Sequence, residues 1–160
     1  MSFKTDLKTI RDVWDLFVSS TNLVAQVPGI SWSISLEPIP KAIIEQGRKR
    51  GGNALGLDTP DFPAEGIVLL LLSATYSPAS TQRDVEKVQA AANQLRSSIV
   101  IKTKQNGVFH PYVDMNHADR NQDPIDSYGG LVNRLFLRAT ALKYDPLRVF
   151  QKLMPGGFKV

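Results

Sequence analysis

The sequence predicts a single-domain α+β protein over residues 1–160, in which an antiparallel sheet is flanked by helices. The chain has 160 residues, 42% of them hydrophobic, which suits one core of ordinary size. Stretches with helical apolar spacing alternate with strand-like stretches. Residues 31–37 alternate apolar with polar side chains, a pattern typical of an antiparallel strand with one solvated face. No strand-like stretch leads into a phosphate-binding turn, which also favours the antiparallel arrangement over a parallel one.

The first third of the chain is expected to form two helices and two strands. Residues 7–27 have apolar positions three and four apart, which predicts an amphipathic helix with Trp14 in the core and a Pro-Gly pair at its end. The alternating strand at residues 31–37 comes next. A helix over residues 40–50 and a short strand at residues 54–57 follow it.

The rest of the chain continues this mixture of elements. The run GIVLLLLSATY is apolar on both faces and predicts a central strand that is covered on each side. Ser77 and Ser80 are candidate N-caps for a helix over residues 81–99. HPYVDMNHA is expected to be extended, and DRNQDPIDSYGG to form a polar loop or a short helical turn. Another amphipathic helix is predicted at residues 131–142, with a short helix at VFQKLM.

The stretch GGNALGL raises the question of a phosphate-binding loop. Such a loop usually follows a strand and opens a helix, so that backbone N–H groups and the helix dipole face the phosphate. Here the order is reversed, because the predicted helix runs into Gly51 and Gly52. We therefore expect one of these glycines to end that helix in a left-handed conformation, with no phosphate role.

Composition argues against several functional classes. The formal charge is +4, but the basic residues are scattered and only GRKR is dense, so nucleic-acid binding is not expected. The longest apolar run is too short for a membrane span, and no signal sequence is visible, which predicts a cytoplasmic protein without membrane contact. The chain has no cysteine and two histidines, so neither a disulfide scaffold nor a metal site is expected.

The segment from Tyr112 to Asp119 holds the densest set of functional groups. In one interpretation Tyr112 and Asn116 donate hydrogen bonds to a substrate carbonyl, and His117 or Asp119 acts as general acid or base. In the other, Tyr112 packs in the core while Asn116 and Asp119 hold the following loop. No GxSxG motif supports a serine nucleophile. The candidate substrate-binding residues elsewhere in the chain are Trp32, Ile34, Asn53, Leu55 and Tyr128.

Four segments together resemble a known family: LEPIPKAIIEQGRKRGGNALGLD, IVLLLLSATY, YVDMNHADRNQDPIDSYGG and KYDPLRVFQKLMPGGFKV. Their order and spacing are similar to the C-terminal third of fungal FAD-linked oxidases of the berberine-bridge-enzyme-like, vanillyl-alcohol-oxidase-type family. The resemblance runs from Phe3 to Val160. It implies an antiparallel sheet with flanking helices that lies over the reactive ring of the flavin, whereas a separate N-terminal domain holds the flavin phosphates.

The chain departs from the family pattern in two ways. It contains no RSGGH-like segment for a covalent flavin link, and the flavin domain does not precede it, so FAD is expected only if a partner chain supplies it. His117 also stands where family members often have an aromatic residue after the asparagine. This change replaces a phenol with a group that can take up or release a proton near neutrality.

These departures predict a cofactor-independent enzyme that cyclises, isomerises or dehydrates a small apolar intermediate of fungal secondary metabolism. Without a redox cofactor the chain alone is not expected to be an oxidase. The alternatives are an accessory or substrate-binding subunit of a split FAD-dependent oxidoreductase, or a non-catalytic protein that binds a metabolite. Exposure of surface that the missing domain would cover further predicts a homodimer.

Overall fold

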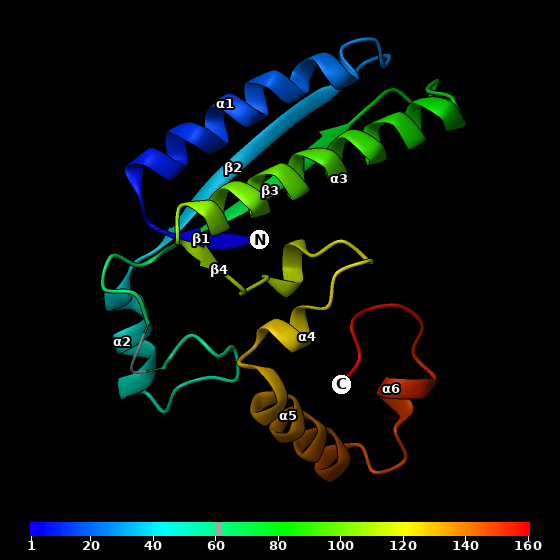
Figure 1. The fold of residues 1–160 in the computed structure, drawn as a ribbon. Coiled ribbons are helices and arrows are strands. Elements are labelled where there is room, and N and C mark those ends of the chain that lie inside the picture. Colours follow the sequence, from blue (N-terminus) through cyan, green and yellow to red (C-terminus); the bar gives the residue numbers. More distant parts are fainter. Residues whose placement is uncertain (60–61) are drawn as a thin grey trace.

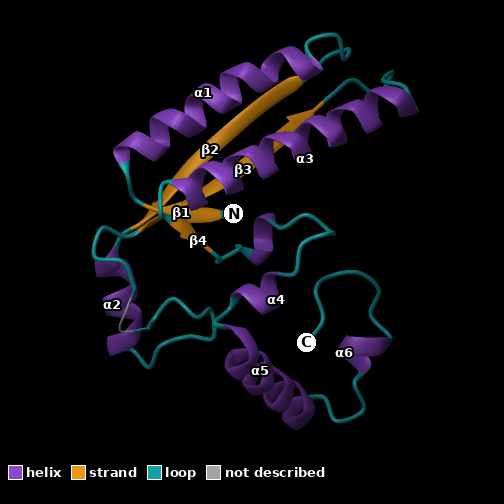
Figure 2. Ribbon diagram, viewed as in Figure 1, coloured by secondary structure: helices purple, strands orange, loops and turns teal. Residues whose placement is uncertain are grey.

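The computed structural model describes residues 1–59 and 62–160. It contains one four-stranded sheet and a set of helices, drawn in Figures 1 and 2, and so confirms the predicted α+β class with an antiparallel sheet. The strands are β1 (Ser2–Lys4), β2 (Ser31–Ile39), β3 (Ile67–Thr75) and β4 (Phe109–His110). The helices are α1 (Leu7–Val24), α2 (Lys41–Lys49), α3 (Gln82–Gln105), the 3-10 turn η1 (Met115–His117), α4 (Pro124–Ser127), α5 (Gly130–Tyr144) and α6 (Val149–Lys152).

The sheet has the strand order β2-β3-β1-β4, and every pair is antiparallel. β2 and β3 pair along their whole length, from Ser31 opposite Thr75 to Ile39 opposite Ile67. β1 is much shorter. It pairs with β4 on one side, and on the other side it pairs with no more than the first three residues of β3. Among the described residues, no strand therefore pairs with the other edge of β3 along residues 71–75.

Helices α1 and α3 lie along β2 and β3 and cover one face of the sheet (Figure 1). The core between them contains Phe3, Val13, Val68, Leu70, Leu95 and Ile99. Burying each of these side chains stabilises the fold by about 1.5–3 kcal/mol. The alternation at residues 31–37 has the predicted effect, because Trp32, Ile34 and Leu36 pack against this core while the serines between them are exposed.

The opposite face of the sheet is covered only in part. Ile67 and Leu69 alternate with Val68 and Leu70, so they point to this second face, where a second core forms around them. The second core also contains Ile44, Leu57, Phe62, Tyr112, Ile125 and Tyr128. The predicted coverage of the central strand on both faces therefore holds for its first residues and fails near its end, where Ser73 and Thr75 are exposed.

Three local predictions are wrong. Residues 54–57 form a turn, because Gly56 has a φ of 71° and the Asn53 side chain accepts a hydrogen bond from the Leu55 N–H. The N-cap of α3 is Thr81, which forms a capping box with Asp84, so neither Ser77 nor Ser80 begins the helix. Trp14 is 56% exposed, since α1 turns Val13 to the core instead.

The extended conformation expected for HPYVDMNHA holds only at its start. β4 ends at His110, and Asp114 then caps the 3-10 turn η1. The alternating faces of a strand therefore do not apply to Tyr112, Asn116 and His117. Among the described residues, no helix combines the length and apolar composition that crossing a membrane requires.

Candidate functional site

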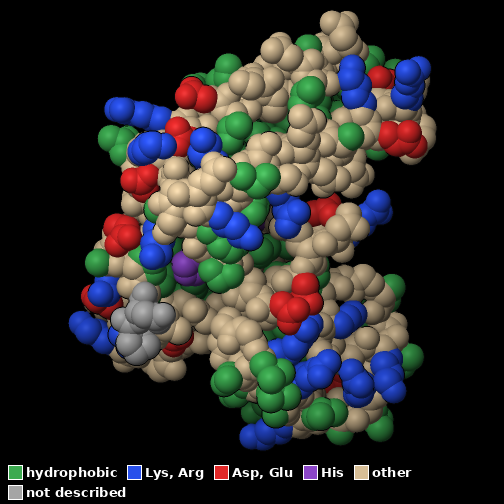
Figure 3. All heavy atoms as spheres, viewed as in Figure 1, with side chains coloured by type: hydrophobic (Ala, Val, Ile, Leu, Met, Phe, Trp, Pro, Cys, Tyr) green, Lys and Arg blue, Asp and Glu red, His purple; other side chains and the backbone are tan. Residues whose placement is uncertain are grey.

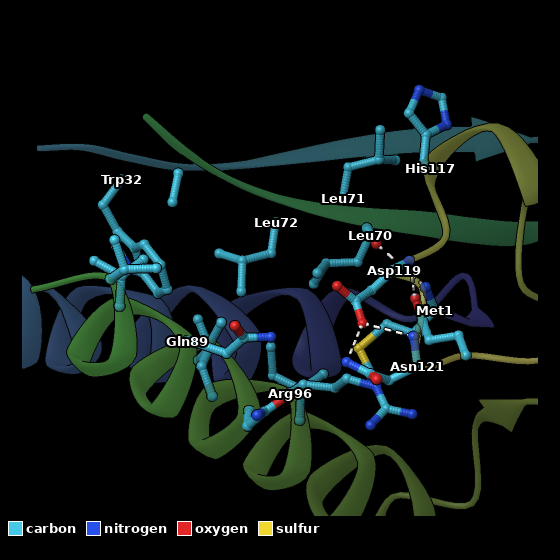
Figure 4. Close-up of a pocket in the computed structure, with 18 of the residues that line it drawn as sticks. Met1, Trp32, Leu70, Leu71, Leu72, Gln89, Arg96, His117, Asp119 and Asn121 are labelled. Carbon is cyan, nitrogen blue, oxygen red and sulfur yellow. Dashed lines mark hydrogen bonds between the residues drawn. The ribbon is translucent and has the colours of Figure 1, made fainter. Parts of the chain in front are cut away.

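A groove of about 330 Å³ lies beside the unpaired edge of β3, between this strand and α3. We call it the β3 groove, and Figure 4 shows its lining residues. Next to the groove, the Met1 carbonyl accepts a hydrogen bond of 2.9 Å from Leu70 N–H. Among the residues that the structure describes, no strand pairs with this edge of β3 beyond that hydrogen bond.

The floor of the β3 groove is apolar. Trp32, Leu70 and Leu72 line it from the sheet, and Val88 and Ala92 line it from α3. The indole N–H of Trp32 donates to the Ser20 hydroxyl at 2.9 Å, so the polar atom of this ring is already bonded within the protein. A bound molecule would therefore meet hydrocarbon along most of this floor, which suits apolar ligands.

Polar groups line one wall and one end of the groove. Gln89 and Arg96 reach it from α3, seven residues apart and so on one helix face. At the end of the groove, the Asp119 carboxylate accepts hydrogen bonds from the backbone and side-chain N–H groups of Asn121, at 2.9 and 2.8 Å. These groups can orient a ligand, whereas the floor supplies the contact area.

His117 lies at the rim of the groove and forms a close pair with Asp114. The distance between His117 Nδ1 and an Asp114 carboxylate oxygen is 2.6 Å, and the side chains are 47% and 20% exposed. Asp114 is held in place because it caps η1. A carboxylate at this position holds the imidazole ring in one orientation, which is the usual support for a histidine acid or base. In Figure 4 the ring points away from the groove floor.

Tyr112 and Tyr128 do not belong to this groove. Both are buried in the second core, and their rings stack at 5.6 Å between centroids. The Tyr128 hydroxyl accepts a hydrogen bond from the Met115 N–H at 3.3 Å. Burial raises the pKa of each phenol, so both remain protonated at neutral pH. Their position favours the packing interpretation of Tyr112 and argues against a substrate contact for Tyr128.

The other predicted site residues are dispersed. Ile34 packs against the first core, and Leu55 packs against the second. Asn53 is exposed in the loop after α2, and Asn116 is exposed beside Asp114. Of the nine predicted residues, Trp32, His117 and Asp119 line the groove, with Trp32 at the opposite end from the other two (Figure 4), and the remaining six do not line it.

Sequence reasoning missed Asp114, Gln89 and Arg96. Asp114 had a usable signal, since an aspartate three residues before a histidine places both on the same side of one turn. Gln89 and Arg96 share the helix face that borders Val88 and Ala92, but periodicity alone does not reveal that this face meets a strand edge. In the described parts of the chain, no three His, Asp or Glu side chains are arranged to hold a metal ion.

The chain is similar to several fungal proteins. FAD-dependent monooxygenase FUP4 of Fusarium proliferatum is 34% identical over 127 residues, which are 79% of this chain and 23% of that protein. FAD-dependent monooxygenase drtC of Aspergillus calidoustus is 31% identical over 163 residues, covering 100% of this chain and 30% of the relative. The bifunctional solanapyrone synthase of Alternaria solani is 30% identical over 125 residues, 78% of this chain and 22% of the synthase.

The chain therefore spans less than a third of the length of these relatives. No family model matches it. No solved structure matches it either. The FAD-linked part of the sequence resemblance agrees with the names of the relatives, while the berberine-bridge-enzyme-like assignment stays a prediction.

The described residues do not offer a cradle for the pyrophosphate of FAD at the glycine-rich stretch. Gly51 and Gly52 follow the C-terminus of α2, and both have a positive φ, which was predicted for one of them. Their N–H groups donate to the carbonyls of Arg48 and Gly47, at 3.1 and 3.0 Å, so they are not free to bind a phosphate. The interpretation of GGNALGL as the end of a helix is confirmed.

Proposed function

We propose that this chain is the substrate-binding part of a FAD-dependent oxidoreductase, and that it binds a small, largely apolar natural product in the β3 groove. The phosphates of FAD would be held by polypeptide outside these 160 residues. The observation that carries the proposal is a groove with an apolar floor and a polar wall and end, in a chain similar to proteins named FAD-dependent monooxygenases. Its volume of about 330 Å³ is at the lower end of the range for small-molecule sites.

Ligand binding by the isolated chain tests the groove. The probe is a fluorescent polyene fatty acid, and the test variant is Ala92→Phe, which fills the groove from α3. The matched control is Ala139→Phe, because Ala139 is exposed on α5 and does not line the groove. We expect Ala92→Phe to abolish binding and Ala139→Phe to leave it unchanged. Equal binding by both variants would show that the probe binds elsewhere.

The link to FAD needs a second experiment. A chimera of the Fusarium proliferatum relative would carry this chain in place of the segment that it matches. We expect the chimera to hold FAD, measured by its absorbance near about 450 nm, because the phosphate-binding part would then come from the relative. A folded chimera without flavin would contradict the proposal.

A cofactor-independent cyclase or isomerase is a second candidate, favoured by the His117–Asp114 pair at 2.6 Å. Such reactions need only proton transfer and a shape that holds a flexible substrate in its reactive conformation. Flavin-free protein would then accelerate the cyclisation or isomerisation of a polyene or polyketide intermediate. His117→Gln should lower the rate about 10²-fold or more if His117 moves the proton. No acceleration by the unmodified chain would dismiss this candidate.

The homodimer stays a prediction under either function. Light scattering at micromolar concentration measures the mass of the particle directly. A monomeric mass would contradict it.

A further inference from the structure

One row of side chains on α3 forms the polar wall of the β3 groove. Gln89, Asn93 and Arg96 line the groove at steps of four and three residues, so they lie on one side of the helix. We call these three residues the α3 row. In the described part of the chain, no hydrogen bond or ion pair joins them to another residue. Their N–H groups can therefore donate to a bound molecule.

The polar groups at the end of the groove are, by contrast, bonded to one another. The Asp119 carboxylate accepts a hydrogen bond from the Asn121 side chain at 2.8 Å, and the Gln122 side chain accepts one from the Asp119 N–H at 2.9 Å. A ligand could use these groups only by replacing bonds that already exist, which gains little. The α3 row is therefore the better place for the polar end of a ligand.

Charge distinguishes Arg96 from the rest of the α3 row. Among the described residues that line the groove, Arg96 is the only Lys or Arg, and Asp119 is the only Asp or Glu. In Figure 4, the Arg96 side chain reaches toward the end of the groove that holds Met1, away from Trp32. Burial, and then the charge of Arg96, lower the pKa of the Met1 amino group. The guanidinium charge therefore acts on groups at this end of the groove.

The apolar floor leads from Trp32 to the end where Arg96 lies. Trp32 is opposite Ala74 in the sheet, and Leu70, at the other end of the floor, is four residues from Ala74 on β3. At about 3.4 Å per residue, these two positions on β3 are about 14 Å apart. A floor of this length can hold an extended hydrocarbon chain, whose far end would then lie near Arg96.

We infer that the ligand of the β3 groove is an acid, in which an apolar chain lies on the floor and ends in a carboxylate that Arg96 binds. The inference rests on the proposed function and names its class of substrate. A guanidinium group offers two parallel N–H donors that match the two oxygens of a carboxylate. Gln89 and Asn93 supply further donors beside it. A neutral chain of equal length would gain the contact with the floor but not this charge-assisted bond.

The surface around the groove has a mixed charge. On the face shown in Figure 3, Lys and Arg side chains over α1 and α3 lie among Asp and Glu side chains. Such a surface does not produce a strong field of one sign, which would attract every anion. A preference of the groove for an acid should therefore depend on Arg96 itself.

Two matched probes test the inference. They are the fluorescent polyene fatty acid and the alcohol with the same chain, both titrated at neutral pH, where the carboxyl group is ionised. The test variant is Arg96→Gln. The control is Arg83→Gln, which removes the same charge from α3 at an exposed residue that does not line the groove.

The unmodified chain and Arg83→Gln should bind the acid about tenfold or more tightly than the alcohol. In Arg96→Gln this preference should disappear, because only the acid uses the guanidinium group. The affinity of Arg96→Gln for the alcohol should stay unchanged, which also shows that its groove is intact.

The outcomes separate this inference from the proposed function. Equal affinity of the unmodified chain for acid and alcohol would overturn the inference and leave the proposed apolar groove standing. Binding of neither probe would contradict the proposed function at its binding site. A preference for the acid that persists in Arg96→Gln, or that both variants lose equally, would overturn the inference, because another group or the net charge would then select the acid. Loss of both probes in Arg96→Gln would contradict it too, since Arg96 would then supply contact area.

Discussion

The sheet with α1 and α3 differs sharply from the segment that contains α5 and α6. In the first region Phe3 and Val13 are 0% exposed, and the core is shared by the sheet and both helices. In the second, the helices contain no buried residue and most of the large apolar side chains face solvent. The first region can therefore be stable on its own contacts, whereas the second contributes little burial until another surface covers it.

This difference separates two roles of apolar residues within one chain. Phe3 and Phe136 are the same amino acid, yet only Phe3 has neighbours on all sides. The free energy of folding should depend on the first region, while association should depend on the second. Four substitutions or conditions test this separation, and they follow in order of decreasing effect on stability.

Phe3→Ala and Phe136→Ala form the sharpest pair. Phe3→Ala leaves a cavity in the first core and should lower the free energy of unfolding by about 3–5 kcal/mol. Phe136→Ala removes a side chain that is 59% exposed and should change it by under about 0.5 kcal/mol. Urea denaturation followed by circular dichroism measures both. Similar losses would mean that the α5–α6 segment is part of the stable core after all.

Gly56→Ala tests the junction between the two regions. Gly56 has a φ of 71°, and a Cβ atom there would lie 2.4 Å from the backbone nitrogen of Gly129, just before α5. Strain and this clash should cost about 1–3 kcal/mol, measured by the same denaturation. Gly107→Ala is the control, because its φ is 69° but no described atom lies within 4 Å of its Cβ position. An equal loss of stability in Gly107→Ala would mean that the positive φ alone explains the effect and that the contact with Gly129 contributes nothing.

Thr81→Ala tests how α3 begins. The Thr81 side chain caps the helix and accepts a hydrogen bond from the Asp84 N–H, so its removal should cost about 1 kcal/mol of stability. Ser80→Ala should cost less, since Ser80 does not cap the helix and its hydroxyl only donates to the Pro28 carbonyl at 3.3 Å. Thermal unfolding measures both variants. A larger loss of stability in Ser80→Ala than in Thr81→Ala would mean that Ser80 caps the helix, as expected from the sequence.

Acid pH should produce the smallest effect, near α4. The backbone N–H of Asp126, helped by Arg134, lowers the pKa of the Asp123 carboxyl. A lowered pKa in the folded state means that the unfolded state binds more protons. The contribution of Asp123 is therefore present above its unfolded pKa of about 4 and lost as the pH falls through the folded value. Asp123→Asn should reduce the fall in stability below about pH 4, and an unchanged pH profile would contradict this assignment.

The periodic elements were predictable from sequence because their signals are local. The alternation around Ile34 and the helical spacing near Val88 each describe one element that must bury one side. Trp14 shows the limit of such reasoning, since it shares the helix with Val13 but not its position toward the sheet. Tyr112 and His117 show the same limit for the site. They are close in sequence, but Tyr112 is buried in the second core, whereas His117 ends the turn η1 at the rim of the groove.

By itself, the sequence determined the α+β class, the main helices and strands, the helix end at Gly51 and Gly52, and the resemblance to FAD-linked fungal enzymes. These properties depend on backbone preference and on apolar spacing within one element. Only the tertiary structure decided that His117 and Asp119 reach the β3 groove and that Tyr112 and Tyr128 do not. Strand pairing and burial depend on which distant segments meet, and no local pattern contains that information.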